Sequence, residues 1–309
     1  MGLRIRNGYG GVPEPLFCSR EKIPSEINRK FDALLRGYLV VGGMPEMWEK
    51  CTKWNETDRV IPFCIKLADV VIRIEPMFDC IREYCREYIT EEQESFTVRV
   101  EPEDIAFERE RSAKEAEREG RADGFYSDAY LETLAVYRRI AEQMLAYDTL
   151  LFHGSVIAVD GAGYLFTAKS GTGKSTHTRL WREQFGSRAV MVNDDKPLLK
   201  VTDEGVMAFG TPWNGKHRLG TNCSVPLKAI CILTRSEENH IEEISPGEAY
   251  QMLLQQSYRP LEKEAVVRSL QLIDLLMKNT KFYRLGCNMD PEAAKVAFEG
   301  MSKAMSEEN

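Results

Sequence analysis

A glycine-rich octapeptide, Ala168–Ser175, holds the residues whose types and spacing are best suited to chemistry. It fits the pattern of Ala or Gly, four variable residues, and then Gly-Lys followed by Ser or Thr. The glycines let successive backbone N–H groups point at one anion, and a following helix adds its positive N-terminal end. The lysine reaches the β and γ phosphates, and the serine hydroxyl binds Mg²⁺. We therefore expect an ATP and Mg²⁺ site whose nucleotide contacts are Ser170, Gly171, Thr172, Gly173, Lys174, Ser175 and Thr176.

Two adjacent carboxylates, Asp194 and Asp195, follow a short apolar run, Ala189–Val192, that predicts a strand. Adjacent acids at a strand end repel each other unless a cation lies near them. A Mg²⁺ ion held by Ser175 and one of the two aspartates would supply that cation. The other aspartate could accept a proton from an attacking hydroxyl, as in phosphoryl transfer. The alternative interpretation is an exposed Asp-Asp turn without chemistry.

A second polar segment, Gly210–Gly220, is bounded by glycines and is basic. Its cationic side chains are Lys216, His217 and Arg218. They could neutralise a transferring phosphate or hold an acidic acceptor. Trp213 could cover the face of a nucleotide or a peptide. An ordinary surface loop is the alternative interpretation. A further histidine, His177, follows the octapeptide and is expected to face solvent.

The octapeptide is preceded by a predicted hairpin and followed by a predicted helix. Two apolar runs, Leu151–Val159 and Tyr164–Ala168, flank an Asp-Gly turn, which is typical of a β-hairpin. The helix is expected over Lys174–Phe185, ended by Gly186. A strand-to-helix connection is the context that a phosphate-binding loop requires.

Further elements are expected on both sides of this region. Downstream we expect a hairpin over 197–209, a strand at Leu227–Leu233, helices at Gly247–Gln256 and Glu262–Met277, a strand at Phe282–Leu285 and a final helix from Asp290. Upstream, Ser127 is a predicted N-cap of an amphipathic helix, whose apolar stripe is Tyr130, Leu134, Tyr137, Ala141 and Met144.

The N-terminal part predicts a smaller unit. Alternating apolar residues from about residue 61, a helix at Met77–Ile89 and a strand at Ser95–Val100 suggest a small α/β module. The mixed-charge run Glu101–Arg121 is expected to be a solvated helix or linker. The predicted domains are an ill-defined extension over 1–55, the module with its linker over 56–122, and a catalytic domain over 123–309.

Composition excludes several classes of protein. The net charge of −7 and the pI of about 5.4 argue against nucleic-acid binding, which usually needs a basic face. No apolar run reaches membrane-spanning length, and no secretory signal is recognisable, so we expect a cytoplasmic protein with no membrane partner. The eight cysteines lack zinc-type spacing and are predicted to be free, buried thiols.

Three segments taken together carry a family resemblance: Phe152–Ser155, the octapeptide, and Asn193–Asp195. They resemble the C-terminal domain of HPr kinase/phosphorylase and, more distantly, the nucleotide domain of phosphoenolpyruvate carboxykinase. The resemblance covers roughly residues 150–235 and implies an α/β fold with a mixed-sheet P-loop core, in agreement with the hairpin. Thr176 stands where HPr kinases commonly have Glu, so the chain resembles a divergent member.

The resemblance also implies roles for individual residues. Lys174 would bind phosphates, and Ser175 with Asp194 would hold Mg²⁺. Asp195 would be the general base, although the two aspartates could have the reverse roles. His153 would lie near the reacting groups and tune the catalytic aspartate. Self-association is a further expectation, because HPr kinases are oligomeric.

The leading hypothesis is an ATP- and Mg²⁺-dependent kinase that phosphorylates a hydroxyl, with Ser or Thr of a protein or peptide as the expected acceptor. A small-molecule kinase or a carboxykinase-like enzyme is the second hypothesis. A peptide kinase predicts an open groove beside Asp195, whereas a small-molecule kinase predicts a closed pocket. The third hypothesis is an ATP-binding regulatory protein without catalysis.

Overall fold

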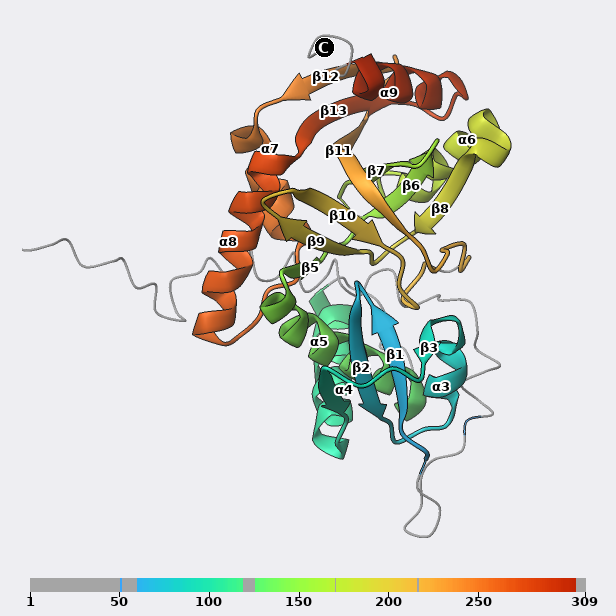
Figure 1. The fold of residues 1–309 in the computed structure, drawn as a ribbon. Helices are drawn as coiled ribbons and strands as arrows, with labels where there is room; N and C mark the ends of the chain where they lie inside the picture. Colours follow the sequence, from blue (N-terminus) through green and yellow to red (C-terminus); the bar gives the residue numbers. More distant parts are fainter. Residues whose placement is uncertain (1–50, 52–59, 119–125, 170, 216, 304–309) are drawn as a thin grey trace, which may run out of the picture.

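The computed structural model describes Cys51 and residues 60–118, 126–169, 171–215 and 217–303 (Figure 1). Most of the predicted N-terminal extension over 1–55 lies outside the described residues. Two predicted site residues, Ser170 and Lys216, also lie outside them. The architecture is mixed α/β with two sheets, so the predicted fold class is confirmed at that level.

The smaller sheet has the strand order β3-β1-β2-β4. Its strands are β1 (Phe63–Leu67), β2 (Val70–Glu75), β3 (Ile89–Thr90) and β4 (Phe96–Arg99). The helices beside it are α3 (Cys80–Tyr84), α4 (Pro102–Arg118) and α5 (Asp128–Met144). Strand β2 pairs antiparallel with β1 and parallel with β4. In Figure 1 this unit lies below the larger sheet.

The larger sheet has the order β5-β9-β10-β11-β7-β6-β8, with β13 on β11 and β12 on β13. Its strands are β5 (Thr149–Leu151), β6 (Ser155–Val159), β7 (Ala162–Thr167), β8 (Ala189–Asn193), β9 (Leu198–Thr202), β10 (Gly205–Phe209), β11 (Ser224–Arg235), β12 (His240–Ile244) and β13 (Lys281–Cys287). Its helices are α6 (Lys174–Phe185), α7 (Pro246–Gln256), α8 (Lys263–Asn279) and α9 (Glu292–Lys303).

The pairing around β7 brings the start of β6 and the ends of β7 and β8 to one edge of the larger sheet. Strand β7 is antiparallel to β6 and parallel to β11, and β8 is antiparallel to β6. The start of β6 therefore lies beside the ends of β7 and β8. The three segments that carry the family resemblance directly precede β6, follow β7 and follow β8.

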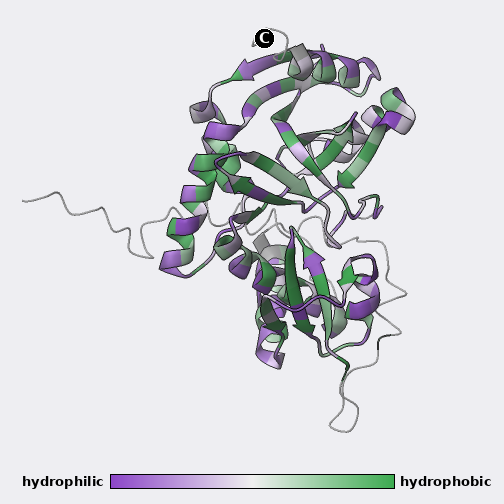
Figure 2. Ribbon diagram, viewed as in Figure 1, coloured by the Kyte–Doolittle hydropathy of each residue, from purple (hydrophilic) through white to green (hydrophobic). Residues whose placement is uncertain are grey.

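Apolar packing fixes this edge from three sides. One core joins α6 and α9 to the sheet around the buried Trp181, and another joins α7 and α8 to it. A third core fills the smaller sheet and includes α5 and Trp213, which is distant from it in the sequence. Figure 2 shows hydrophobic residues concentrated on the strands and alternating with hydrophilic ones along α8.

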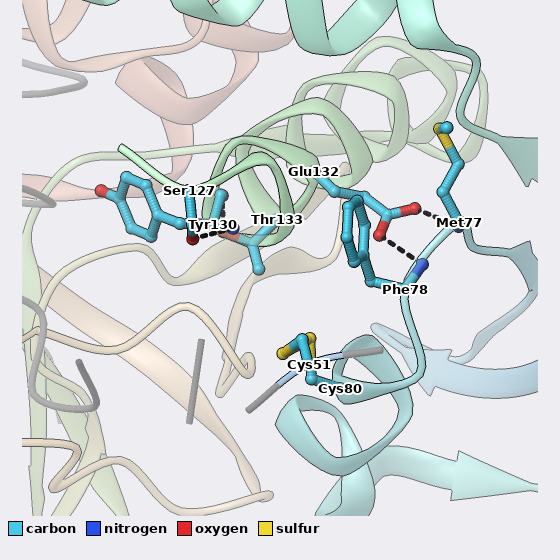
Figure 3. Close-up of a disulfide and its surroundings, with 8 residues drawn as sticks. All are labelled: Cys51, Met77, Phe78, Cys80, Ser127, Tyr130, Glu132 and Thr133. Atoms are coloured by element: carbon cyan, nitrogen blue, oxygen red, sulfur yellow. Dashed lines mark hydrogen bonds between the residues drawn. A yellow bond between two sulfur atoms is a disulfide. The ribbon is translucent and has the colours of Figure 1, made fainter. Parts of the chain in front are cut away.

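Local signals predicted many elements correctly. Both hairpins are present, and α6 spans the predicted residues. Ser127 caps α5, with its hydroxyl accepting a hydrogen bond from the Tyr130 N–H at 3.2 Å (Figure 3). The helix expected at Met77–Ile89 is shorter, because α3 ends at Tyr84 and a 3-10 turn follows. The domain division at residues 55 and 122 stays a prediction.

The prediction that the charged run Glu101–Arg121 is solvated is wrong for two of its acids. Asp104 and Glu108 are buried, and both form ion pairs with Arg138 of α5, at 2.7 and 2.8 Å. These contacts dock one face of α4 on α5. A mixed-charge run can therefore bury charge when a cation on a neighbouring helix matches it.

The prediction that all cysteines are free thiols is also wrong. Cys51 and Cys80 form a disulfide, which ties the chain preceding the smaller sheet to the start of α3 (Figure 3). The free cysteines among the described residues are Cys64, Cys85, Cys223, Cys231 and Cys287. In the part of the chain that the structure describes, no helix combines the length and apolar character needed to cross a bilayer.

Candidate active site

The shared edge of β6, β7 and β8 is held together by the backbone. The Gly154 N–H donates to the Asp195 carbonyl at 3.0 Å, and the Ser155 hydroxyl donates to the Asp194 carbonyl at 2.9 Å. The Thr167 hydroxyl, at the end of β7, donates to the His153 carbonyl at 3.1 Å. The segments around His153, the octapeptide and the Asp pair therefore form one structural unit, as the sequence predicted.

The octapeptide makes a turn between β7 and α6. Gly171 and Gly173 have φ angles of 75° and 118°, a region that residues with a side chain rarely adopt. The Thr172 N–H and hydroxyl both bond to the Lys169 carbonyl, and Arg235, at the end of β11, donates to the Gly171 carbonyl at 2.6 Å. Helix α6 starts at Lys174, so the first-turn N–H groups and the positive helix end face this turn.

Asp195 is the centre of a buried charge cluster. Its Oδ2 lies 2.8 Å from Lys196 Nζ, and its Oδ1 lies 3.3 Å from His153 Nε2. Burial by itself would raise the pKa of Asp195, but the Lys196 charge and the contact with His153 outweigh it and hold that pKa below its ordinary value. Asp195 is therefore a buried carboxylate that stays ionised.

Two lysines face this carboxylate. Lys196 is fully buried, and Lys174 is 7% exposed. Burial lowers the pKa of Lys174 to about 8, with Asp195 acting in the opposite direction and Lys196 reinforcing the shift. The cluster therefore brings together two cationic side chains and one carboxylate, which favours an additional anion at this point.

His153 is neutral in this surrounding. Burial, followed by the charges of Lys174 and Lys196, lowers its pKa to about 3. Because the ring is uncharged, the 3.3 Å contact with Asp195 is not an ion pair. His153 Nδ1 lies 2.7 Å from Gln256 Oε1, at the end of α7, so Gln256 sets the orientation of the ring.

Asp194 points to a different partner from Asp195. The Asn193 side-chain oxygen accepts hydrogen bonds from the N–H groups of Asp195 and Lys196 at 2.8 and 2.6 Å, which fixes a tight turn. Asp194 Oδ1 accepts from the Gly215 N–H at 2.5 Å. Burial raises the pKa of Asp194, and Asp195 adds to the rise, while the Gly215 N–H opposes it.

The residues expected to hold Mg²⁺ fit such an ion chemically. Ser175 lies exposed in the first turn of α6, and Asp194 lies at the neighbouring strand end. The Gly215 N–H holds Asp194 through its Oδ1. A hydroxyl and a carboxylate are the hard oxygen ligands that Mg²⁺ takes.

The predicted loop Gly210–Gly220 runs between the Asp pair and the smaller sheet. Its first residue, Gly210, approaches the carbonyls of Val192 and Thr221 so closely that a Cβ would lie 2.8 and 2.1 Å from them. Trp213 does not offer a face to a ligand as predicted, because it is 2% exposed and donates to the Thr133 carbonyl at 3.1 Å. The loop therefore joins the two sheets.

The basic residues of this loop have separate surroundings. Arg218 lies 4.5 Å above the Tyr84 ring of α3 and donates to the Tyr84 carbonyl at 3.3 Å. His217 is exposed, and its charge acts on Asp194 to lower the pKa of that carboxyl. The expected phosphate-binding roles of Arg218 and His217 stay predictions.

His177 does not face solvent as expected. It is 2% exposed, and its Nε2 accepts a hydrogen bond from Trp181 Nε1 at 3.0 Å. Burial lowers the pKa of His177 to about 4. The residue is part of the packing between α6 and β7, where its ring also contacts Phe166.

Sequence reasoning missed Lys196 and Gln256 as members of the site. Lys196 directly follows the Asp pair, and this position in the sequence indicates that its amine could belong to the site. Gln256 carries no such signal, because it is 103 residues from His153 and reaches it only in the fold.

Comparisons with known proteins give a family model and similar solved structures. The model of the family "SynChlorMet cassette protein ScmC" matches residues 129–285, about half of the chain. The solved structure of the Hpr(Ser) kinase/phosphatase from Coxiella burnetii is similar over 50% of this chain and 97% of its own, with 11% sequence identity and a TM-score of 0.30. A likeness of that size carries no argument about function. No curated protein matches the chain.

Proposed function

This chain belongs to the family of the SynChlorMet cassette protein ScmC, and we propose that it is an ATP- and Mg²⁺-dependent kinase that phosphorylates a hydroxyl. One observation carries the proposal. Lys174, the first residue of a helix that follows a glycine turn, is buried within electrostatic reach of an ionised carboxylate, Asp195. A lysine that binds phosphate beside a carboxylate that receives a hydroxyl is the arrangement that phosphoryl transfer uses.

The nucleotide phosphates would lie over the turn between β7 and α6. The positive φ angles of Gly171 and Gly173 and the start of α6 support a phosphate-binding loop of the P-loop type. Lys174 would bind the β and γ phosphates, and the Lys196 amine lies 2.8 Å from the Asp195 carboxylate. The core would then be a mixed-sheet P-loop fold, as the resemblance to HPr kinase/phosphorylase implies.

Mg²⁺, held by Ser175 and Asp194, would neutralise charge on the β and γ phosphates. The chain's own residues would handle the acceptor. Asp195 would accept a hydrogen bond from the acceptor hydroxyl and take its proton as the oxygen–phosphorus bond to the γ phosphorus forms. The bond between that phosphorus and the β–γ bridging oxygen breaks, and ADP leaves.

The low basicity of Asp195 is compatible with this role. In phosphoryl transfer most of the bond to the leaving group breaks before much charge develops on the attacking oxygen, so positioning contributes more than base strength. Asp195 is held on one oxygen by Lys196 and contacts His153 through the other. These contacts with Lys196 and His153 fix the orientation of the Asp195 carboxylate toward an acceptor.

We propose Ser or Thr of a protein or peptide as the acceptor, with the smaller sheet beside the site as the partner-recognising part. A small-molecule acceptor is a second candidate, and the burial of the site favours it. Asp195 is 3% exposed and His153 is 1% exposed, which suits a closed pocket more than an open groove. A cytoplasmic setting and self-association remain part of the proposal.

A transfer assay tests the proposal. The purified chain would be incubated with Mg²⁺, γ-labelled ATP and fractionated lysate, beside the variants Lys174→Ala and Asp195→Asn. Lys169→Ala is the matched control for the first, because Lys169 is an exposed lysine of the same turn. Asp160→Asn is the control for the second, because Asp160 lies exposed in the hairpin turn and pairs with Arg188.

We expect label on a discrete acceptor with the wild type and both controls, and its loss in both site variants. Label on a peptide or protein supports the first acceptor class, and label on a small molecule supports the second. Bound ATP without any transfer would contradict the kinase proposal and favour an ATP-binding regulatory protein. ATP binding is measured separately, so a chain that binds ATP without transferring phosphate can be told from a chain that does not bind ATP.

A further inference from the structure

Tyr137, in the middle of α5, carries a hydroxyl that the fold does not use. The residue is 6% exposed, and its ring packs against Trp213 with the ring centres 5.1 Å apart. Its hydroxyl oxygen is buried and has no hydrogen-bond partner among the residues that the structure describes. Leaving a buried hydroxyl unpaired costs free energy, so such groups in folded proteins usually meet a water or a ligand.

The contacts of the Tyr137 ring place the residue next to the loop that holds the Asp pair, because Trp213, on which the ring packs, lies two residues before Gly215, whose N–H donates to Asp194 Oδ1 at 2.5 Å. Burial raises the pKa of Tyr137 well above its ordinary value, and the next largest contribution comes from the negative charge of Asp195. Tyr84 of α3 and Tyr258, which follows α7, add smaller contributions. Tyr84 also packs against Trp213, with the ring centres 6.1 Å apart, so both tyrosines border the same loop.

The neighbouring side chains cannot serve as its partner in their present arrangement. The Tyr258 hydroxyl donates to Glu142 Oε1 at 2.9 Å. The Asp195 carboxylate is held by Lys196 and contacts His153, and the Tyr137 hydroxyl makes no hydrogen bond to it. Trp213 directs its N–H away to the Thr133 carbonyl. The Tyr137 hydroxyl is therefore a buried polar group that no described residue satisfies, which leaves it available to a bound molecule.

We propose that the Tyr137 hydroxyl contacts the acceptor and orients the group that receives the phosphate. The inference rests on the proposed kinase function and extends it to a wall of the acceptor site. Helix α5 would form that wall opposite the end of β8, with Trp213 supporting the phenol ring from behind. The acceptor would then need a polar group within hydrogen-bonding distance of the phenol as it meets Asp195.

The test is Tyr137→Phe, which removes only the oxygen. Tyr88→Phe is the matched control, because Tyr88 is also a buried phenol without a described hydrogen-bond partner, and Asp195 is not among the charges that act on it. Thermal unfolding, ATP affinity and transfer from Mg·ATP would be measured for the full chain. The acceptors used are water, a library of Ser- and Thr-containing peptides, and a set of small polyols.

We expect Tyr137→Phe to slow transfer roughly 10- to 100-fold, the loss that follows removal of one hydrogen bond to a reacting substrate. Its ATP affinity should stay within about twofold of the wild type, and its unfolding midpoint should not fall. Tyr88→Phe should match the wild type in all three measurements.

Two results would overturn the inference. Transfer by Tyr137→Phe at the wild-type rate would show that the hydroxyl touches no acceptor. A fall in its unfolding midpoint that Tyr88→Phe does not share would show that the hydroxyl has a structural partner instead. Failure of the kinase proposal looks different, because the wild type itself would then bind ATP without transferring phosphate to water, peptide or polyol.

Discussion

Lys196 and Asp195 form a buried ion pair whose two members depend on each other. Lys196 is fully buried, and its amine lies 2.8 Å from the Asp195 carboxylate. Removing one partner of such a pair leaves an uncompensated charge in a medium that solvates it poorly. The pair is therefore a structural requirement of the site as well as a part of its chemistry.

We predict that Lys196→Met lowers the free energy of unfolding by about 3 kcal/mol, because Asp195 is then buried without its cation. Denaturation by urea measures the loss. Adding Asp195→Asn to Lys196→Met should recover part of it. Lys200→Met is the control, since Lys200 pairs with Asp69 at the surface and should cost below about 1 kcal/mol. Equal losses of unfolding free energy in Lys196→Met and Lys200→Met would contradict this account.

Glu132 is a second buried acid, in α5, and it shapes how stability depends on pH. It is fully buried and accepts hydrogen bonds from the N–H groups of Met77 and Phe78, the latter at 3.0 Å (Figure 3). Burial raises its pKa to about 8, although the two N–H groups act against the rise. The folded chain therefore keeps a proton on Glu132 at pH values where the unfolded chain has lost it.

This difference predicts that the Glu132 contribution to stability is complete below about pH 4.5 and is lost as the pH rises toward 8. Glu132→Gln cannot titrate, so its stability should lack this component. Relative to the wild type, the variant should gain on the order of 4 kcal/mol between pH 4.5 and pH 8. Urea unfolding at a series of pH values measures the gap, and a constant gap would exclude the effect.

At the scale of elements, the turn between β7 and α6 depends on backbone freedom. Gly173 has a φ of 118°, and a Cβ there would meet no atom within 4 Å, so only backbone strain opposes a side chain. We predict that Gly173→Ala costs about 1–2 kcal/mol of strain and weakens ATP binding about tenfold or more. Calorimetric titration with Mg·ATP measures the affinity.

Gly161→Ala is the matched control for this prediction. Gly161 has a φ of 83° in the turn between β6 and β7, and a Cβ there would also meet no atom within 4 Å. The control should lose similar stability and keep its ATP affinity. If both variants bind ATP like the wild type, the turn is not the phosphate-binding element.

Several elements could be predicted because their signals are local. The Asp-Gly turn marks the hairpin that precedes the octapeptide, and Ser127 marks the start of α5. Strand β12 escaped prediction because four polar or half-exposed residues precede its one buried residue, Ile244, and its pairing with β13 defines it. The grouping of His153 with the Asp pair at one edge of the sheet was predictable through the resemblance to HPr kinase/phosphorylase.

Other contacts of the site depend on partners that are far apart in the sequence. Nothing near His153 indicates that Gln256 will meet it, and nothing in α5 indicates that Tyr137 will pack against Trp213. The burial of Glu108 was mispredicted for the same reason, because its partner Arg138 lies on another helix. Such contacts follow from how elements pack, which local patterns do not encode.

On the scale of the whole molecule, the loop from Gly210 to Gly220 connects the two sheets. It holds Asp194 through the Gly215 N–H at one end and covers Tyr84 with Arg218 at the other. Arg218 has a φ of 47°, which is unfavourable for a residue with a side chain. The contact with Tyr84 therefore has to offset backbone strain.

This arrangement predicts that the glycine variant of Arg218 is more stable than the alanine variant. Arg218→Ala removes the contact and keeps the strain, so it should lower the free energy of unfolding by about 1–2 kcal/mol. Arg218→Gly removes both and should be more stable than the alanine variant by about 1 kcal/mol. Urea unfolding compares them. An alanine variant at least as stable as the glycine variant would contradict the role assigned to strain.

The backbone frame of the site lies within one continuous stretch, from His153 to Lys196. The bonds from Gly154 to Asp195 and from Ser155 to Asp194 close a loop of moderate length, whereas the bond from His153 to Gln256 spans a far longer one. Short loops lose less chain entropy on closure, and contacts between neighbours in sequence form sooner. During synthesis, this frame can therefore assemble before α7 and α8 have left the ribosome, and the histidine ring acquires its fixed orientation last.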